Sequence, residues 1–212
     1  GSSMHIIEQL GLEPVIIPEM QRSINPKKDG IAYNKIQKII QDFKPDIVHT
    51  HASKAGALGR KAALSCKVPI IVHTFHGHVF HSYFGKIKTF IFKNIERYLA
   101  KKTAGIIAIS DIQKKELCEI YKIAPKDKTK VIPLGFDLEI FQKDYEKNRI
   151  QTRNKYEIDE NTVAIAIVGR ITAIKDHHYF LEVIESVFRS SNKKIKIFIV
   201  GDGDLKAEIE ER

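Results

Sequence analysis

The feature that most constrains this chain is an alternation of short runs rich in valine and isoleucine with longer stretches of helical periodicity. Short apolar runs bounded by turn residues are typical of strands buried in a parallel sheet. They are Pro14–Ile17, Asp46–His49, Pro69–Phe75, Gly105–Ile109, Lys130–Ile132, Val163–Val168 and Ile195–Val200. The helical stretches are Ile31–Phe43, Lys54–Cys66, Phe84–Lys102, Ile112–Tyr121, His177–Arg189 and one that starts near Asp204. This order predicts an α/β fold with parallel strands joined by crossover helices.

The alternation is interrupted once, between Gln142 and Glu160, where the chain is charged and poor in large aliphatic residues. A new apolar run follows and ends in Gly169-Arg170. We therefore predict two Rossmann-like domains, over residues 4–142 and 143–212. Two strands and two helices are too few to bury both faces of a sheet, so we expect the second domain to be incomplete.

Composition and short motifs argue against several classes of protein. No apolar run approaches the roughly 20 residues of a membrane-spanning helix, and no signal peptide is recognisable, so we expect a cytoplasmic protein. The two cysteines lack the spacing of a zinc site or a disulfide framework. The net charge of +9 favours anionic partners, but no aromatic residues interleave the cations as nucleic-acid binding would require. No Gly-x-Gly-x-x-Gly follows the first run, which argues against a nicotinamide cofactor.

Residues that could bind a ligand or take part in a reaction follow several of the predicted strands. Ligands of open parallel sheets bind at the carboxyl ends of the strands, where small residues admit a ligand and cations or imidazoles can contact it. The residues at these positions are His51, Lys54, His76, Gly77, Ser110, Gly135, Asp137, Gly169, Arg170, Lys175, Gly201 and Gly203.

Four of these segments, in this order, resemble the glycosyltransferases of family 4, which have the two-domain GT-B architecture. They are His76-Gly77, the turn Pro133–Asp137, Gly169-Arg170 with Lys175, and Gly201-Asp202-Gly203. The sequence departs from the family pattern at Asp176, where a glycine is usual, and at Leu134, where an asparagine is usual. Neither departure removes a charged group.

The resemblance implies an enzyme that transfers a hexose-type sugar, with retention, from a nucleotide-diphosphate sugar to a saccharide or lipid-linked acceptor in bacterial surface polysaccharide synthesis. It implies no cofactor or metal. Arg170 and Lys175 would bind the donor diphosphate, where a guanidinium and an ammonium stabilise the departing anion. Catalytic His76 would contact the donor sugar, while Gly169, Gly201 and Gly203 would let the backbone approach the nucleotide. His51, Lys54, Gly77, Ser110, Gly135 and Asp137 are candidates for contacts on the acceptor side or for support of the site.

The family's glycine-rich first loop would precede His5 and its donor glutamates would follow Arg212. The resemblance therefore implies a first domain without its first strands and a chain that is inactive by itself. Two other functions stay open: a non-catalytic module that binds sugar nucleotides or polysaccharides, and a GT-B epimerase that acts on a sugar nucleotide alone.

Other polar groups near these segments favour structural roles. Alternate residues of an extended segment face opposite sides, so we expect His73, His78 and His81 to be structural. A metal site of His49, His51, His73 and His76 is disfavoured because no carboxylates accompany it. Asp202-Gly203-Asp204 matches a metal-binding pattern of another glycosyltransferase fold, but we interpret Asp204 as a helix N-cap.

The helical stretch from Phe84 to Lys102 carries a stripe of cations at 100° per residue, which Phe90 shares. A solvated face is one interpretation, and contact with the anionic inner face of the plasma membrane is the other. The candidate membrane contacts are Lys86, Phe90, Lys93, Arg97 and Lys101. We expect Ile87, Ile91, Ile95, Tyr98 and Leu99 to pack on the sheet.

Overall fold

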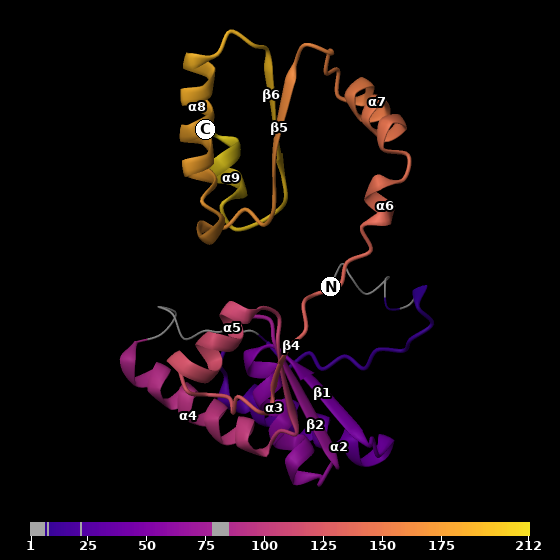
Figure 1. Cartoon of the computed structure of the whole chain (residues 1–212), viewed down its shortest axis with the longest axis vertical. Coiled ribbons are helices and arrows are strands. Elements are labelled where there is room, and N and C mark those ends of the chain that lie inside the picture. Colours follow the sequence, from indigo (N-terminus) through magenta and orange to yellow (C-terminus); the bar gives the residue numbers. More distant parts are fainter. Residues whose placement is uncertain (1–6, 8, 22, 78–84) are drawn as a thin grey trace. The chain divides into compact units, whose positions relative to one another are not determined.

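The computed structural model describes residue 7 and residues 9–21, 23–77 and 85–212. The chain divides into two compact units, Gly1–Gly135 and Phe136–Arg212 (Figure 1). The predicted boundary lay seven residues later, after Gln142. Each unit contains parallel strands and crossover helices, which confirms the predicted α/β class.

The first unit is built on a parallel sheet with the strand order β1-β2-β3-β4. Its strands are β1 (Ile47–His51), β2 (Ile70–Phe75), β3 (Gly105–Ala108) and β4 (Thr129–Val131). Its helices are α2 (Pro26–Phe43), α3 (Ser53–Ser65), α4 (Lys86–Lys102), α5 (Asp111–Lys115) and the π-helical turn η1 (Glu116–Ile120). These elements fall close to the predicted ranges, except that α4 was expected from Phe84, which lies outside the described residues.

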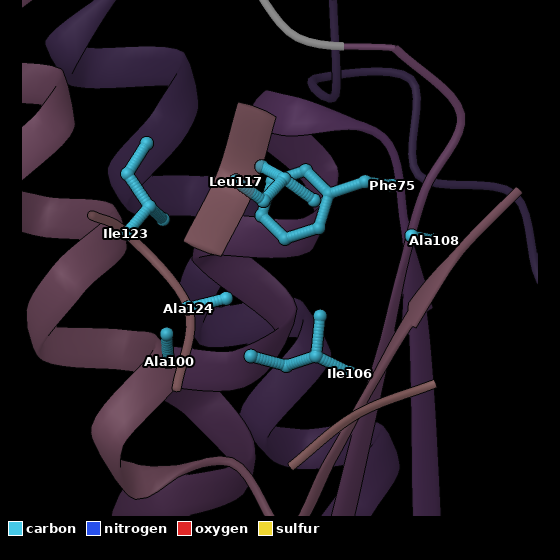
Figure 2. Packing of buried hydrophobic residues seen from close by; sticks show 7 residues of the cluster. All are labelled: Phe75, Ala100, Ile106, Ala108, Leu117, Ile123 and Ala124. Carbon is cyan, nitrogen blue, oxygen red and sulfur yellow. The ribbon is translucent and has the colours of Figure 1, made fainter. Parts of the chain in front are cut away.

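The helices of this unit pack on one face of its sheet. Ile71 of β2 packs with Ile40 of α2 and with Ala62 and Ala63 of α3. On the same face of the sheet, a second cluster joins β2 and β3 to α4, η1 and the segment after η1, as Figure 2 shows. Its members are Phe75, Ala100, Ile106, Ala108, Leu117, Ile123 and Ala124. Alternate strand residues point to the opposite face, where Ile47 and Ile70 are exposed.

Helix α3 lies unusually close to the sheet because two glycines face it. A Cβ at Gly56 would come within 2.4 Å of Cε1 of His73, and one at Gly59 within 2.9 Å of Cγ2 of Thr50. The short distance brings Arg60, which is 0% exposed, deep into the unit. There its Nη2 donates to Glu96 of α4 at 2.6 Å, and its Nε donates to the Gly56 carbonyl at 3.0 Å.

The Arg60–Glu96 pair determines which face of α4 meets the unit. Glu96, Leu99 and Ala100 are buried, whereas Ile87 is 78% exposed and Tyr98 is 61% exposed. The prediction that Ile87, Ile91, Ile95 and Tyr98 pack on the sheet is therefore wrong, and of the five only Leu99 is buried. Rotating α4 to bury the isoleucines would separate Glu96 from Arg60 and leave the buried guanidinium without its counter-charge, so the pair outweighs the apolar residues in setting the rotation of the helix.

The cationic stripe of α4 is only partly free. Arg97 donates from Nε to the Lys122 carbonyl at 3.0 Å and from Nη2 to the Tyr121 carbonyl at 2.8 Å. Lys93 lies 4.5 Å from the centre of the Tyr121 ring. Phe90 and Lys101 are exposed, and the Lys86 side chain lies outside the described part of the chain.

The second unit contains a parallel pair, β5 (Val163–Val168) and β6 (Ile195–Val200), in continuous register from Val163↔Ile195 to Val168↔Val200. Both strands match their predicted ranges. Helix α8 (His177–Ser190) connects them, and α9 (Lys206–Glu210) follows β6. The unit begins with α6 (Glu139–Gln142) and α7 (Tyr145–Lys155), and continues from β5 into the short 3₁₀ helix η2 (Ala173–Lys175).

Two sequence-based expectations about local structure are wrong, and one helix was not predicted. Pro14–Ile17 is not a strand: Val15 and Ile16 are exposed, and the flanking prolines Pro14 and Pro18 cannot donate to a ladder. Helix α7 was not predicted, because it has no buried residue and so lacks apolar periodicity. Asp204 does not cap α9, whose N-cap is Leu205 without a side-chain bond.

In the described part of the chain, no helix is both long enough and apolar enough to cross a membrane.

The close approach of α3 to the sheet makes a prediction about Gly56. We expect Gly56→Ala to lower the free energy of unfolding by about 1–3 kcal/mol, because the new methyl group collides with the buried His73 ring. Gly30 of α2 is the control, since a Cβ there would meet nothing within 4 Å. Gly30→Ala should stabilise the chain by about 0.5–1 kcal/mol through helix propensity. Urea unfolding followed by circular dichroism measures both, and equal stability of the two variants would contradict the packing described above.

Candidate functional site

Two histidines from neighbouring strands meet at the carboxyl edge of the first unit's sheet. β1 and β2 are paired in parallel with His51 opposite Thr74, so His76 extends just beyond that pair. Nδ1 of His51 and Nε2 of His76 are 2.9 Å apart and share a hydrogen bond. On the same face of β1, Nε2 of His49 lies 2.8 Å from Oγ1 of Thr74. The structure thus brings predicted residues His51 and His76 into direct contact.

The surroundings of His51 favour its neutral form. Burial lowers the pKa of His51, and the neighbouring His49 and His76 lower it further, because a proton on one ring disfavours a proton on the next. A neutral imidazole can both donate and accept a hydrogen bond. The His51 ring can therefore both donate and accept a hydrogen bond at this edge of the sheet.

Backbone strain lies directly beside this pair. Ala52 has φ 62° and ψ 167°, a region that glycine populates and that costs other residues about 1–3 kcal/mol. Its carbonyl accepts from the Gly56 N–H at 3.0 Å, which starts α3. Sequence reasoning missed Ala52, because nothing in the residue type signals a positive φ. Strain of this size clusters at functional sites. It therefore supports the carboxyl end of β1 as part of a candidate functional site.

His73 is structural, as predicted. It is 0% exposed, and its Nδ1 lies 2.8 Å from Oγ1 of Thr50. Burial lowers its pKa to about 3, and the nearby Arg60 guanidinium adds to the effect. His78 and His81, also expected to be structural, lie outside the described residues.

Several other predicted site residues have structural partners. Lys54 forms an ion pair with Asp29 and donates to the carbonyls of Gln21 (2.8 Å) and Ser23 (2.5 Å), which neutralises its charge. Ser110 caps α5 by accepting from the Gln113 N–H at 3.2 Å, a role that serine often has at a helix N-terminus.

The remaining predicted residues near the first unit's strand ends are small or lie in turns. Gly77 and Gly135 have open space where a Cβ would be, with nothing within 4 Å. Asp137 belongs to the second unit and accepts from the Glu139 N–H at 3.1 Å. None of these contacts by itself indicates a ligand.

In the second unit, the loops after β5 and β6 run side by side. The Gly169 N–H donates to the Val200 carbonyl at 2.9 Å, and the Ile171 N–H to the Asp202 carbonyl at 3.0 Å. A Cβ at Gly201 would lie 1.9 Å from the Gly169 carbonyl oxygen, and one at Gly203 would lie 2.1 Å from that of Ile171. Both glycines are therefore required by the contact between the loops, a reason that does not involve a nucleotide.

This pair of loops presents two unpaired cations. Arg170 and Lys175 are exposed, and neither has an ion pair with any described residue. The stem of Lys175 passes Gly169, where a Cβ would be 3.8 Å from the lysine Cε. The two cations thus share one short loop at the carboxyl end of β5, an arrangement suited to a diphosphate.

Asp176 explains one departure from the family pattern. It has φ 49° and ψ 54°, the left-handed conformation that glycine favours and that aspartate tolerates. Its side chain also caps α8, with Oδ1 accepting from the Tyr179 N–H at 3.2 Å. The substitution therefore preserves the turn and adds a cap.

Sequence reasoning also passed over two residues with buried polar atoms, Thr172 in this loop and His177 at the start of α8. His177 is 1% exposed, and its ring nitrogens and Oγ1 of Thr172 have no hydrogen-bond partner among the described residues. Buried polar groups are rarely left unpaired. The loop therefore has hydrogen-bonding capacity that its own described groups do not use.

The described residues contain no group of three or more His, Cys, Asp or Glu side chains placed to hold a metal ion.

Comparison with known proteins identifies relatives over nearly the whole chain. The model of Glycosyltransferase Family 4 matches residues 7–140. The chain is 35% identical over 196 residues to an Escherichia coli UDP-Gal:alpha-D-GlcNAc-diphosphoundecaprenol alpha-1,3-galactosyltransferase, covering 91% of this chain and 50% of that protein. It is 27% identical to the Staphylococcus aureus capsular polysaccharide biosynthesis glycosyltransferase CapM, covering 92% and 51%. The chain thus spans about half the length of these relatives.

Solved structures share the fold. A glycosyltransferase from Rickettsia africae has a TM-score of 0.73 at 23% identity, covering 100% of this chain and 53% of that one. Anabaena HepE in complex with UDP and glucose has a TM-score of 0.73 at 17% identity, covering 100% and 55%. A UDP-N-acetylglucosamine 2-epimerase from Rickettsia bellii has a TM-score of 0.58 at 15% identity, covering 100% and 55%.

The buried state of His73 predicts a pH dependence. Its pKa is about 3 in the folded chain, against an ordinary value of 6.5, so the unfolded chain binds a proton that the folded chain excludes. The contribution of His73 to stability is therefore complete above about pH 6.5 and is lost as the pH falls towards 3. Linkage gives a loss of about 2 kcal/mol between pH 7.5 and pH 5.

His73→Asn removes this titration while keeping a polar side chain. We expect the difference in free energy of unfolding between the original chain and His73→Asn to shrink by about 2 kcal/mol over this range. Urea titrations at the two pH values measure it. A difference that stays constant with pH would show that His73 titrates normally in the folded state.

Proposed function

The chain belongs to glycosyltransferase family 4, and from this we propose that its protein transfers a sugar from a nucleoside-diphosphate sugar to a saccharide or lipid-linked acceptor. The observation that carries the proposal is the pair of unpaired cations, Arg170 and Lys175, on the loop at the carboxyl end of β5. Carboxyl ends of parallel strands are where open α/β sheets bind nucleotides. The HepE structure, with UDP and glucose bound, supports this class of donor.

In the proposed reaction, Arg170 and Lys175 hold the donor diphosphate. As the bond between the sugar and the diphosphate breaks, negative charge grows on the leaving oxygen. A guanidinium and an ammonium already in place stabilise that charge more in the transition state than in the ground state, which is the requirement for catalysis.

We assign contact with the transferred sugar to His76. Its hydrogen bond to His51 fixes the orientation of the ring, and the lowered pKa of His51 favours the neutral form of that partner. Retention of configuration and a cytoplasmic location at the inner face of the plasma membrane stay predictions from the sequence.

The acceptor class draws support from the relatives. The Escherichia coli relative is named for transfer to a sugar on diphosphoundecaprenol, and CapM for capsular polysaccharide biosynthesis. We therefore favour an acceptor saccharide carried on a lipid diphosphate, in the synthesis of a surface polysaccharide.

A sugar-nucleotide epimerase is the second candidate, because the fold also matches UDP-N-acetylglucosamine 2-epimerases. The two reactions differ in their need for an acceptor. Incubation of the complete gene product with donor alone, followed by analysis of the sugar nucleotide, separates them: an epimerase changes the donor sugar, whereas a transferase leaves it unchanged until an acceptor is added.

The diphosphate site predicts the effect of removing its cations. We expect Arg170→Ala and Lys175→Ala each to weaken binding of UDP about 10- to 100-fold, because each deletes a charge-assisted hydrogen bond. Lys147→Ala is the matched control, since Lys147 is an exposed cation of α7 in the same unit. Isothermal titration calorimetry with UDP measures all three. Equal affinity of Arg170→Ala and Lys147→Ala for UDP would contradict the assignment of the diphosphate to this loop.

The assignment of His76 predicts a different pattern. We expect His76→Ala to lower the turnover number of the complete gene product about 10- to 100-fold through the lost hydrogen bond to the sugar, while the Kd for UDP stays unchanged. His49→Ala, which removes a neighbouring imidazole bonded to Thr74, should have the smaller effect. An unchanged turnover number in His76→Ala would contradict the assignment of His76 to the transferred sugar.

A further inference from the structure

Two residues of the segment that carries Arg170 and Lys175 have buried polar groups without partners. Thr172 lies between the two cations in the sequence, and His177 lies two residues after Lys175. Oγ1 of Thr172 and both ring nitrogens of His177 are buried, and none of them has a hydrogen-bond partner among the described residues. The unused hydrogen-bonding groups therefore fall in the same short segment as the cations of the candidate diphosphate site.

These two side chains differ from the other buried polar side chains of the chain. Among the described residues, buried atoms without a hydrogen-bond partner also occur in Asp29, Arg60 and His73. Each of those three side chains has a partner through another interaction: an ion pair for Asp29, bonds from Nε and Nη2 for Arg60, and a bond at Nδ1 for His73. In Thr172 and His177, every polar side-chain atom lacks a partner in the described part of the chain.

Unpaired buried groups destabilise a fold in a way that a simple change of sequence would remove. A buried polar atom that leaves water without gaining a hydrogen bond costs free energy, whereas an apolar side chain of the same shape does not. Valine has the shape of threonine, and leucine is close to histidine in volume. Native proteins leave few such groups, and each calls for an explanation such as a role in catalysis or binding. Two of them in one segment with two unpaired cations point to a common ligand.

The segment is fixed at both ends and exposed in the middle. At its start, the Ile171 N–H donates to the Asp202 carbonyl at 3.0 Å, and the Ile171 carbonyl accepts from the Leu205 N–H at 3.1 Å. At its end, the Asp176 side chain caps α8. Between these points the three residues of the η2 turn, Ala173–Lys175, are exposed. A rearrangement confined to this turn therefore changes what the two buried side chains contact, while both ends stay in place.

We infer that Thr172 and His177 form their missing hydrogen bonds when the donor diphosphate binds. The Thr172 hydroxyl donates to a phosphate oxygen, which is an acceptor without a proton to give. His177 is a positioning residue: its ring nitrogens bond the backbone of the η2 turn in its bound form and hold Lys175 in place. This inference rests on the proposed function and extends it, because the diphosphate is then recognised by a hydroxyl as well as by two cations.

Binding of UDP and of uridine to the complete gene product tests the inference, because only UDP carries the diphosphate. By isothermal titration calorimetry, we expect Thr172→Val to weaken UDP binding about 10-fold, since a bond to a charged oxygen is lost, and His177→Leu about 5-fold. Neither variant should change uridine binding. In urea titrations both should be at least as stable as the original protein, because each replaces an unpaired buried polar group with an apolar one.

Conservative variants and a matched control separate a hydrogen bond from a change of shape. Thr172→Ser keeps the hydroxyl and should bind UDP within about 2-fold of the original protein. His177→Gln keeps a donor and an acceptor and should restore most of the affinity that His177→Leu loses. Thr152→Val, on the exposed helix α7 of the same unit, is the matched control and should bind UDP as the original protein does.

Two results would overturn the inference while the proposed function stands. One is unchanged UDP binding in Thr172→Val and His177→Leu when Arg170→Ala weakens it. The other is a loss of uridine affinity as large as that for UDP together with lower stability, which would show a purely structural role. If Arg170→Ala binds UDP as tightly as the original protein, the proposed diphosphate site fails and the inference falls with it.

Discussion

The ion pair between Arg60 and Glu96 is the contact on which the first unit depends. It joins α3 to α4 inside the protein, and Gly56 and Gly59 make it accessible by letting α3 approach the sheet. Breaking one partner of such a pair typically costs about 3–5 kcal/mol, because the other charge is left buried and alone. Burial raises the pKa of Glu96 while the guanidinium opposes that rise. The guanidinium of the same pair also lowers the pKa of His73, and the pair fixes the rotation of α4 with Ile87 and Tyr98 facing outward.

The sequence predicted the strands better than it predicted the packing of the helices. β5 and β6 matched because each is a short run rich in Val and Ile, residues that favour strands, bounded by turn residues. The orientation of α4 was missed because hydrophobic periodicity ranks isoleucine above glutamate, whereas the partner of Glu96 lies 36 residues away in the sequence. Pro14–Ile17 has strand composition, but composition does not supply a neighbouring strand. Helix α7 has no buried residue to create a period.

Some features of the candidate site could likewise be predicted from the sequence, whereas others are seen only in the structure. That polar residues gather at the carboxyl ends of strands follows from parallel topology, and the meeting of His51 with His76 agrees with it. The strain at Ala52 and the use of Gly201 and Gly203 in loop contacts depend on atomic distances that no residue pattern contains. Arg170 and Lys175 could be selected from the sequence because a cation beside a glycine after a strand is specific. Their lack of a counter-charge among the described residues is a structural result.

Sugar transfer by the complete gene product tests the account most directly. The protein is incubated with a panel of labelled nucleotide sugars and membrane-lipid acceptors, with and without a chelator, and the lipid fraction is analysed by mass spectrometry. The account predicts that one donor passes its sugar to the lipid fraction and that the chelator does not prevent it. Turnover of no donor, or conversion of a donor sugar without any acceptor, would contradict it.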